Sequence, residues 1–242
     1  MKLRDLTVMI TGATSGVGLS LTEAFIENGN KVIAIGRNQP VLDDLQQKFK
    51  ANVHTIQGDL STRGGIDSIL QQVETNFSSI DVLINNAAVQ YNYDFFESAE
   101  AIFQIQNEVT TNLTAPILLT ALLLPLMENS ATPAIVNVTS GLALQPKMSA
   151  PVYCATKAGL HVFTRALRYQ FEKSKVKVFE LMLPLVDTPM TRDRGKGKLS
   201  PDDVAKKLIN GMKKDRYELY IGKVKLLRFL VRWFPFLAEK AL

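Results

Sequence analysis

The stretch LTVMI at residues 6–10 runs directly into TGATSGVG at residues 11–18, and these thirteen residues decide the fold. The first five are apolar or β-favouring and predict a short buried strand. The glycines that follow permit a tight turn, and residues 19–27 have helical spacing. Such a turn lets a pyrophosphate approach backbone N–H groups at the helix N-terminus. The spacing is G-x-x-x-G-x-G rather than the usual G-x-G-x-x-G, so the turn taken alone also fits an ordinary loop.

The rest of the chain continues this alternation of strands and helices. Short β-rich runs recur at residues 31–35, 53–56, 81–84, 134–138, 176–182 and 217–221. Segments with helical spacing occupy residues 17–27, 41–49, 65–77, 101–127, 152–171 and 201–212. The alternation predicts an α/β protein: a single-domain, Rossmann-like doubly wound parallel sheet of about seven strands with helices on both faces. In such a sheet the ligand site lies at the carboxyl ends of the strands.

The composition narrows the kind of protein. The 242 residues are 46% apolar, enough for a large core without disulfide or metal staples. A single cysteine, Cys154, excludes a disulfide framework, and the two distant histidines, His54 and His161, predict no metal site. Residues 6–10 are too short for a signal peptide, and the longest apolar run, residues 117–127, is too short to span a membrane. We expect a cytoplasmic protein.

The end of the second predicted strand indicates which nicotinamide cofactor fits. Gly36 and Arg37 stand about 20 residues beyond the glycine turn, where an acidic residue would hold the ribose 2′-hydroxyl of NAD. Arg37 instead offers a guanidinium that can pair with a 2′-phosphate. A solvated surface arginine is the alternative interpretation. We predict NADP(H), with NAD(H) as the weaker candidate.

A tyrosine and a lysine at helical spacing form the candidate catalytic pair. Tyr153 and Lys157 are four residues apart on a predicted helix, hence on one face. A nearby ammonium favours the phenolate and is expected to lower the tyrosine pKa. Tyr169 and Lys173 repeat the spacing, but about 24 Å further along the same helix, so both pairs cannot serve one site. The first pair is favoured because Ser140 directly follows the predicted strand 134–138 and can reach the same place.

Seven motifs in one order complete the pattern. They are Thr11–Gly18, Asp59 with Leu60, Asn85–Ala87, Asn112, Ser140, Tyr153 with Lys157, and Pro184–Thr188. Through them the chain resembles a classical short-chain dehydrogenase/reductase over roughly residues 5 to 222. Residues 135–143 and 151–157 are similar to the short-chain oxidoreductases encoded in some D-alanylation (Dlt) operons. The resemblance implies the strand order 3-2-1-4-5-6-7 and a homodimer or homotetramer.

The resemblance also implies residue roles. Tyr153 would be the general acid in carbonyl reduction and the base in alcohol oxidation, and Ser140 would polarise the substrate oxygen. Lys157 would lower the tyrosine pKa and bind the nicotinamide ribose, while Asn112 would hold a water that links Lys157 to solvent. The expected cofactor-binding residues are Gly12, Thr14, Ser15, Gly16, Val17, Gly18, Arg37, Asp59, Leu60, Asn86, Ala87, Tyr153, Lys157, Pro184, Val186 and Thr188.

Three positions depart from the family pattern. Ala88 replaces the glycine of Asn-Asn-Ala-Gly, Leu185 replaces the glycine of Pro-Gly, and Ser15 stands where many NADP(H) users carry a basic residue. We expect a bulky Leu185 beside the nicotinamide pocket, with altered local geometry and retained cofactor binding. The NADP(H) prediction therefore depends on Arg37 alone.

These observations favour an NADP(H)-dependent oxidoreductase that acts on a carbonyl/alcohol pair through Ser140, Tyr153, Lys157 and Asn112. A non-catalytic NADP(H)-sensing protein on the same fold is the alternative, and a lyase or epimerase ranks below both. The substrate is not specified by the sequence. In this family it is set by the loop after the sixth strand, here residues 189–199, and such a loop is expected to be mobile.

The positive charge is concentrated at the C-terminal end. Residues 1–191 carry a net charge of −3 and residues 192–242 a net charge of +8, which together give +5. No nucleic-acid reading element accompanies this charge, so no nucleic-acid partner is expected. We expect a domain over residues 1–222 and a basic amphipathic helical tail over residues 223–242. The tail fits either peripheral membrane contact or packing in a homo-oligomer interface or on its own core, and the sequence favours packing.

Overall fold

Seven parallel strands form one sheet in a computed structural model that describes residues 1–92, 94–96 and 101–239. The strands are β1 (Thr7–Thr11), β2 (Lys31–Gly36), β3 (Val53–Gln57), β4 (Val82–Asn85), β5 (Ala134–Ser140), β6 (Lys177–Leu183) and β7 (Glu218–Tyr220). Their order is β3-β2-β1-β4-β5-β6-β7, which confirms the predicted doubly wound topology. The order reverses between β1 and β4, so this is the point at which a ligand cleft is expected.

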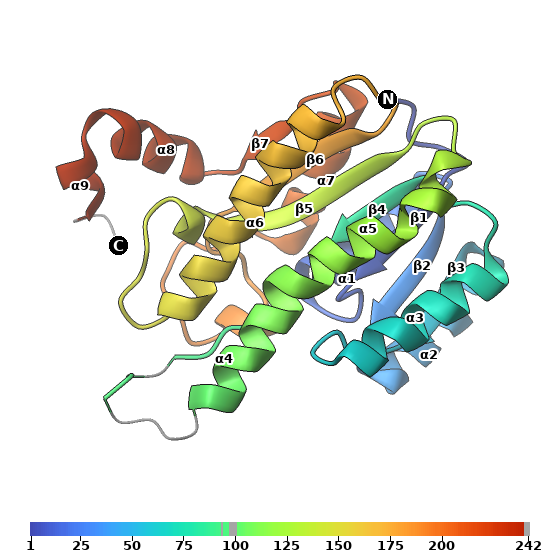
Figure 1. The fold of residues 1–242 in the computed structure, drawn as a ribbon, viewed down its shortest axis with the longest axis horizontal. Helices are drawn as coiled ribbons and strands as arrows, with labels where there is room; N and C mark the ends of the chain where they lie inside the picture. Colours follow the sequence, from blue (N-terminus) through green and yellow to red (C-terminus); the bar gives the residue numbers. More distant parts are fainter. Residues whose placement is uncertain (93, 97–100, 240–242) are drawn as a thin grey trace.

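Helices cover both faces of the sheet (Figure 1). They are α1 (Gly16–Glu27), α2 (Gln39–Phe49), α3 (Arg63–Asn76), α4 (Ala101–Val109), α5 (Ala115–Glu128), α6 (Pro151–Gln170), α7 (Pro201–Lys213), α8 (Val224–Trp233) and α9 (Pro235–Glu239). Shorter helical turns are η1 (Lys50–Asn52), η2 (Thr110–Thr114), η3 (Gly141–Ala143) and η4 (Pro189–Thr191). In Figure 1 helices α3, α5 and α6 lie in front of the sheet, with α1 and α7 behind it.

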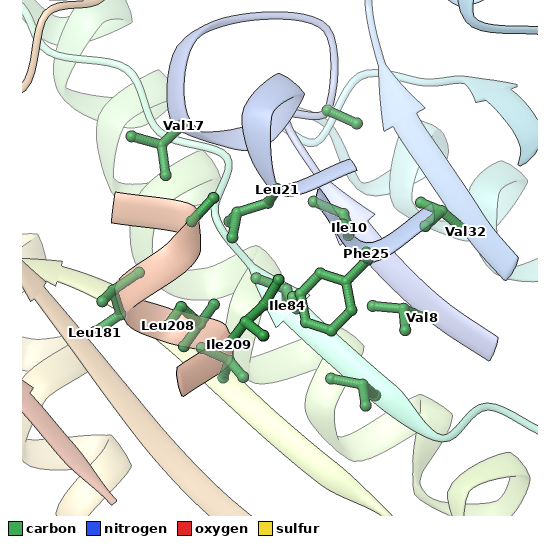
Figure 2. Packing of buried hydrophobic residues seen from close by; sticks show 14 of the residues in the cluster. Val8, Ile10, Val17, Leu21, Phe25, Val32, Ile84, Leu181, Leu208 and Ile209 are labelled. Atoms are coloured by element: carbon green, nitrogen blue, oxygen red, sulfur yellow. The ribbon is translucent and has the colours of Figure 1, made fainter. Parts of the chain in front are cut away.

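Strand alternation divides the core into two layers. In β1 the side chains of Val8 and Ile10 face the layer formed with α1, α2 and α7, whereas Met9 faces the layer formed with α3 and α5. Figure 2 shows the first layer, in which Phe25 of α1 lies among Val8, Ile84 and Ile209. Because both layers are closed by helices, the central strands are apolar on both faces, as the continuous hydrophobic runs predicted.

The predicted helix over residues 101–127 is interrupted by a π-helical turn. Helix α4 passes through η2 into α5, and η2 carries Asn112. Together these elements are long and apolar enough to cross a membrane, which the sequence analysis did not expect of any segment. However, Leu119, Leu123 and Met127 are fully buried against the sheet, so α5 is a core helix.

The C-terminal helices extend beyond the sheet. After β7 the chain enters α8 and α9, which Figure 1 shows at one end of the molecule, clear of the strands. Val224 at the start of α8 is buried, and a β-carbon on Gly141 would come within 3.3 Å of the Val224 and Leu227 side chains. The first turn of α8 is therefore fixed to η3, directly after the end of β5.

Candidate active site

A cleft of about 410 Å³ lies at the carboxyl ends of the central strands. Among the predicted site residues, those that line the cleft are Gly12, Thr14, Ser15, Gly16, Val17, Gly18, Arg37, Asp59, Leu60, Asn86, Ala87, Ser140, Tyr153, Lys157, Pro184, Val186 and Thr188. Lining residues outside the predicted catalytic and cofactor-binding set are Ile35, Gly36, Asn38, Gly58, Ala88, Val89, Thr111, Val138, Thr139, Leu183, Pro189, Met190 and Thr191, of which the last three belong to the loop 189–199 that was expected to set the substrate. Most of these residues are next to a predicted one in the sequence, so including all residues at each strand end would have identified them.

The glycine turn has the shape of an anion cradle. Gly12 and Gly16 adopt φ of +67° and +50°, and a β-carbon on Gly18 would lie 2.0 Å from the Gly12 carbonyl oxygen. Ser15 precedes α1 without capping it through its side chain. The first N–H groups of α1 therefore remain available as hydrogen-bond donors at the cleft, which suits a pyrophosphate.

Thr11 and Asn86 fasten this turn to the end of β4. The Asn86 side-chain amide donates to the Thr11 carbonyl over 2.9 Å, and the Thr11 hydroxyl accepts from the backbone N–H groups of Asn86 and Ala87, each at 3.0 Å. The Asn86 amide also donates to the Gly12 carbonyl over 3.3 Å. Asn86 thus holds the turn in place, a role visible only once β1 and β4 are known to be neighbours.

Arg37 lies at the rim of the cleft, directly after β2. Its side chain is exposed, and within the described part of the chain no acidic group forms an ion pair with it. Gly36 leaves room for the neighbouring turn, since a β-carbon there would meet the Thr14 methyl group at 2.4 Å. After the end of the next strand, β3, Asp59 uses one carboxylate oxygen to accept from the Ser61 N–H at 2.9 Å.

The candidate catalytic side chains come from two elements. Ser140 is the last residue of β5 rather than the residue after the strand, and Tyr153 and Lys157 lie one turn apart in the first half of α6. The Lys157 ammonium donates to the Val138 carbonyl over 2.9 Å and lies 5.8 Å from the centre of the Tyr153 ring. The Ser140 hydroxyl accepts from the Leu142 N–H at 3.2 Å and is also a hydrogen-bond partner of the Tyr153 phenol.

Burial controls the protonation of both groups. It raises the pKa of Tyr153 to about 12, and the hydrogen bond to Ser140 acts in the opposite direction. Burial also lowers the pKa of Lys157 to about 8. The net shift of the Tyr153 pKa is therefore upward, with removal of the phenol from water as the largest cause. The ammonium of Lys157 hydrogen-bonds the backbone at Val138, and the expectation that it lowers the Tyr153 pKa stays a prediction.

Asn112 lies behind the cleft wall rather than in it. Its carbonyl oxygen accepts from the Val89 N–H, and its amide donates to the Val89 carbonyl, both at 2.8 Å. The same amide donates to the Thr156 hydroxyl over 3.3 Å, next to Lys157. Asn112 is fully buried, and its neighbour Thr111 lines the cleft in its place. The side chain therefore fixes the loop after β4 against α6.

Ala88 and Leu185, which replace glycines of the family pattern, fit the local backbone. Ala88 lines the cleft, and neither Ala88 nor Leu185 requires a positive φ. Leu185 is not among the residues that line the cleft, and its methyl group would lie 2.7 Å from a β-carbon on Gly195 in the loop after β6. The expected effect of this bulky side chain beside the nicotinamide pocket stays a prediction. Tyr169, the repeat of the tyrosine spacing, is 70% exposed and does not line the cleft.

The loop after β6 is tied to the other side of the cleft. Arg194 donates to the Gln90 side chain, which belongs to the loop after β4. Lys198 donates to the Thr191 carbonyl over 2.6 Å and forms an ion pair with Asp187 at 3.5 Å. These contacts fix residues 187–199 over the end of the cleft that contains Tyr153, and Arg194 acts to lower the pKa of that phenol.

A buried charge network supports the end of β5 from behind. Glu180 on β6 is almost fully buried and accepts from the Thr139 hydroxyl at 2.6 Å. His161 and Arg168 of α6 contact the same carboxylate at 2.8 Å and 3.6 Å. Thr139 lines the cleft next to Ser140, so the network sets the position of this strand end. Sequence reasoning missed it because no motif spacing links these residues.

The comparisons with known proteins agree with this site. The sequence profile of the short chain dehydrogenase family matches residues 6–199, and the chain belongs to that family. It is similar to DltE, an uncharacterized oxidoreductase of Bacillus subtilis (strain 168), at 36% identity over 96% of this chain and 94% of DltE. It is also similar to YdfG, an NADP-dependent 3-hydroxy acid dehydrogenase of Escherichia coli O6:H1, at 32% identity over 78% of this chain and 77% of YdfG.

A solved structure repeats the fold over the whole chain. A short chain dehydrogenase from Burkholderia cenocepacia J2315 in complex with NADP superposes with a TM-score of 0.88, at 22% identity, over 99% of this chain and 98% of that one. At that identity the likeness shows the fold alone. Family membership makes the protein an oxidoreductase with a nicotinamide cofactor and a small-molecule substrate.

Proposed function

We propose that the protein is an NADP(H)-dependent reductase or dehydrogenase that interconverts a carbonyl and an alcohol through Ser140, Tyr153 and Lys157. The observation that carries the proposal is the convergence of these three side chains in the cleft that also holds the glycine turn. A protein that only senses the cofactor needs no phenol hydrogen-bonded to a serine at the end of such a cleft.

The cleft fits a nicotinamide dinucleotide. The glycine cradle and the free N–H groups of α1 suit the pyrophosphate, and Arg37 suits a 2′-phosphate on the adenosine ribose. Lys157 and Tyr153 lie toward the far end, where they would contact the nicotinamide ribose. The cofactor supplies the hydride, and the protein supplies position and electrostatics.

In the reductive direction Tyr153 gives its proton to the carbonyl oxygen as negative charge develops there. Ser140 donates a second hydrogen bond to the same oxygen and so stabilises that charge. In the oxidative direction the phenolate of Tyr153 takes the proton from the alcohol. A pKa of about 12 keeps the phenol protonated at neutral pH, which favours its role as the acid.

Lys157 and Asn112 act on this proton transfer in different ways. The ammonium of Lys157 would contact the nicotinamide ribose, and it lies 5.8 Å from the centre of the Tyr153 ring. Asn112 is a positioning residue, because its hydrogen bonds to Val89 and Thr156 hold the loop after β4 against α6.

The test is a screen of ketones, aldehydes and quinones for oxidation of NADPH by the wild-type protein and by Tyr153→Phe. We expect turnover of at least one carbonyl class by the wild type, and a loss of about 10²-fold or more in Tyr153→Phe with NADPH affinity kept. Tyr169→Phe is the matched control, since this exposed tyrosine has the same spacing to a lysine on the same helix. Equal turnover by wild type and Tyr153→Phe would refute the mechanism.

A further inference from the structure

The C-terminal helices present an apolar surface that the body of the protein does not cover. We call eight exposed side chains of this segment the tail surface, and they are Lys225, Leu226, Phe229, Arg232, Trp233, Phe234, Phe236 and Leu237. Leu226, Phe229 and Trp233 are 60%, 52% and 63% exposed, which is rare for such large apolar residues on one short helix.

Helical spacing divides α8 into three faces. Val224, Leu227 and Val231 are buried or half-buried and face the body. Leu226, Phe229 and Trp233 follow at i, i+3 and i+7 and form an apolar stripe on the exposed side. The third face repeats this spacing with Lys225, Arg228 and Arg232 and lies beside that stripe.

The charges between Lys223 and Ala238 all have one sign, and Glu239 at the end of α9 is the first acidic residue of the tail. Residues 223–238 contain four basic side chains, Lys223, Lys225, Arg228 and Arg232, and no acidic one. Arg228 pairs with Glu218 at 3.5 Å and stacks on the Tyr220 ring at 4.3 Å, so it anchors α8 to the body. Within the part of the chain that the structure describes, Lys225 and Arg232 have no acidic partner.

We propose that the tail surface docks on an anionic lipid bilayer. An apolar stripe of Leu, Phe and Trp beside a basic stripe is the pattern of a helix that lies in the membrane interface. Anionic headgroups supply the negatively charged partner that Lys225 and Arg232 do not have within the described part of the chain. Each basic residue near the bilayer surface adds to the attraction. A second copy of this chain fits less well, because its own tail surface contains no acidic side chain that could pair with Lys225 and Arg232.

The docking site lies at the same edge of the sheet as the cleft. The first turn of α8 packs on Gly141, the residue after Ser140, and Gly222 packs near Pro184, which lines the cleft. Figure 1 shows α8 and α9 on the same side of the molecule as α4 and the segment between β5 and α6. A bilayer bound to the tail surface would therefore lie near the end of the cleft that contains Tyr153.

The experiment uses the full-length protein and two kinds of vesicle. One contains equal parts of phosphatidylglycerol and phosphatidylcholine, and the other contains phosphatidylcholine alone. Trp233 is the single tryptophan of the chain, so its intrinsic fluorescence reports on the tail surface without a label. We expect co-sedimentation with the anionic vesicles, a shift of tryptophan emission to shorter wavelength, and weakening of both signals at high salt.

Two variants separate charge from apolar contact. Lys225→Gln with Arg232→Gln is expected to weaken binding to anionic vesicles by roughly 30-fold. Leu226→Ser with Phe229→Ser is expected to abolish the emission shift while Trp233 stays in place as the reporter. Since the four residues are exposed, the thermal midpoint should change little. Lys206→Gln with Lys207→Gln, an equal loss of charge from exposed positions of α7, should bind as the wild type does.

Three outcomes would overturn the proposal. One is the absence of binding to anionic vesicles by the wild type. Another is an equal loss of binding in the α7 control, which would indicate net charge alone. The third is a combination of results. The tryptophan emission of the wild type is already at short wavelength in buffer, the variant with Leu226→Ser and Phe229→Ser has a smaller particle mass, and vesicles change neither signal. That result would assign the tail surface to contact between copies of the chain.

Discussion

At the residue scale, the protonation of the candidate catalytic pair depends on burial. Tyr153 and Lys157 are both withdrawn from water, yet their pKa values move in opposite directions because the phenol is neutral when protonated and the amine is charged. The lysine pKa of about 8 brings its titration close to the physiological range. A proton can therefore leave or reach this amine with little free-energy cost.

The Lys157 pKa has a measurable effect on stability. A folded-state pKa of about 8 against 10.5 in the unfolded chain means that the unfolded state binds more protons between these two pH values. The free energy of unfolding contributed by Lys157 therefore rises with pH across this window, by roughly 3 kcal/mol. Denaturant titrations of the cofactor-free wild type and of Lys157→Met at pH 8 and pH 10.5 measure this difference. Parallel pH profiles would show that the amine is not desolvated.

Arg37 is the residue on which the proposed preference for NADP(H) depends. Arg37→Asp replaces the guanidinium with a carboxylate that repels a 2′-phosphate and can accept from a 2′-hydroxyl. We expect NADPH affinity to fall by about 10²-fold, with NADH affinity unchanged or higher. Binding of both cofactors is measured by titration of their fluorescence. Lys50→Asp, an exposed charge reversal outside the cleft, is the control, and equal losses for both cofactors would show that Arg37 does not read the phosphate.

At the scale of elements, the turn between β1 and α1 depends on close backbone approach. Gly18 lies in the first turn of α1, where a β-carbon would be 2.0 Å from the Gly12 carbonyl oxygen and 2.5 Å from the Asn86 amide. The turn, the helix and the loop after β4 therefore meet at one point. A side chain in place of Gly18 would push the turn, the helix and the loop apart.

Gly18→Ala is expected to disrupt this junction. Since the clash is with backbone, the helix must shift, and we expect a loss of about 3 kcal/mol in the free energy of unfolding together with weaker NADPH binding. Gly64→Ala is the matched control, because a β-carbon on Gly64 in the first turn of α3 meets no atom within 4 Å. That control should be neutral or slightly stabilising. Chemical denaturation and cofactor titration measure both effects, and equal stability of the two variants would contradict the argument.

Most of the sheet and cleft could be predicted because strand ends in a parallel fold converge. Ser15, Asp59 and Pro184 follow three different strands, and all three line one cleft. The position of Asn112 could not be predicted in the same way. Asn112 lies in the π-helical turn η2, and its side chain hydrogen-bonds Val89 and Thr156, which no periodic sequence pattern indicates.

At the scale of the whole molecule, the C-terminal end carries the excess positive charge, and its last two helices expose several large apolar side chains close together in sequence. The region up to residue 191 is slightly acidic, and the excess positive charge belongs to the last 51 residues. The two core layers bury nearly all of the large apolar side chains of the strands, whereas six large apolar side chains after residue 222 stay at least half exposed. The C-terminal helices therefore combine positive charge with several large apolar side chains that are exposed to solvent.

The hydrogen bonds between Thr11 and Asn86 also determine when the cleft can form during synthesis of the chain. The glycine turn is among the first segments to leave the ribosome, but the strand that fixes it, β4, begins only at Val82. Because a chain is made from its N-terminus, the turn stays incomplete until this second half of its support has emerged. A nascent chain that ends before Asn86 lacks the amide that holds the turn, so nucleotide binding cannot stabilise the growing chain before that point.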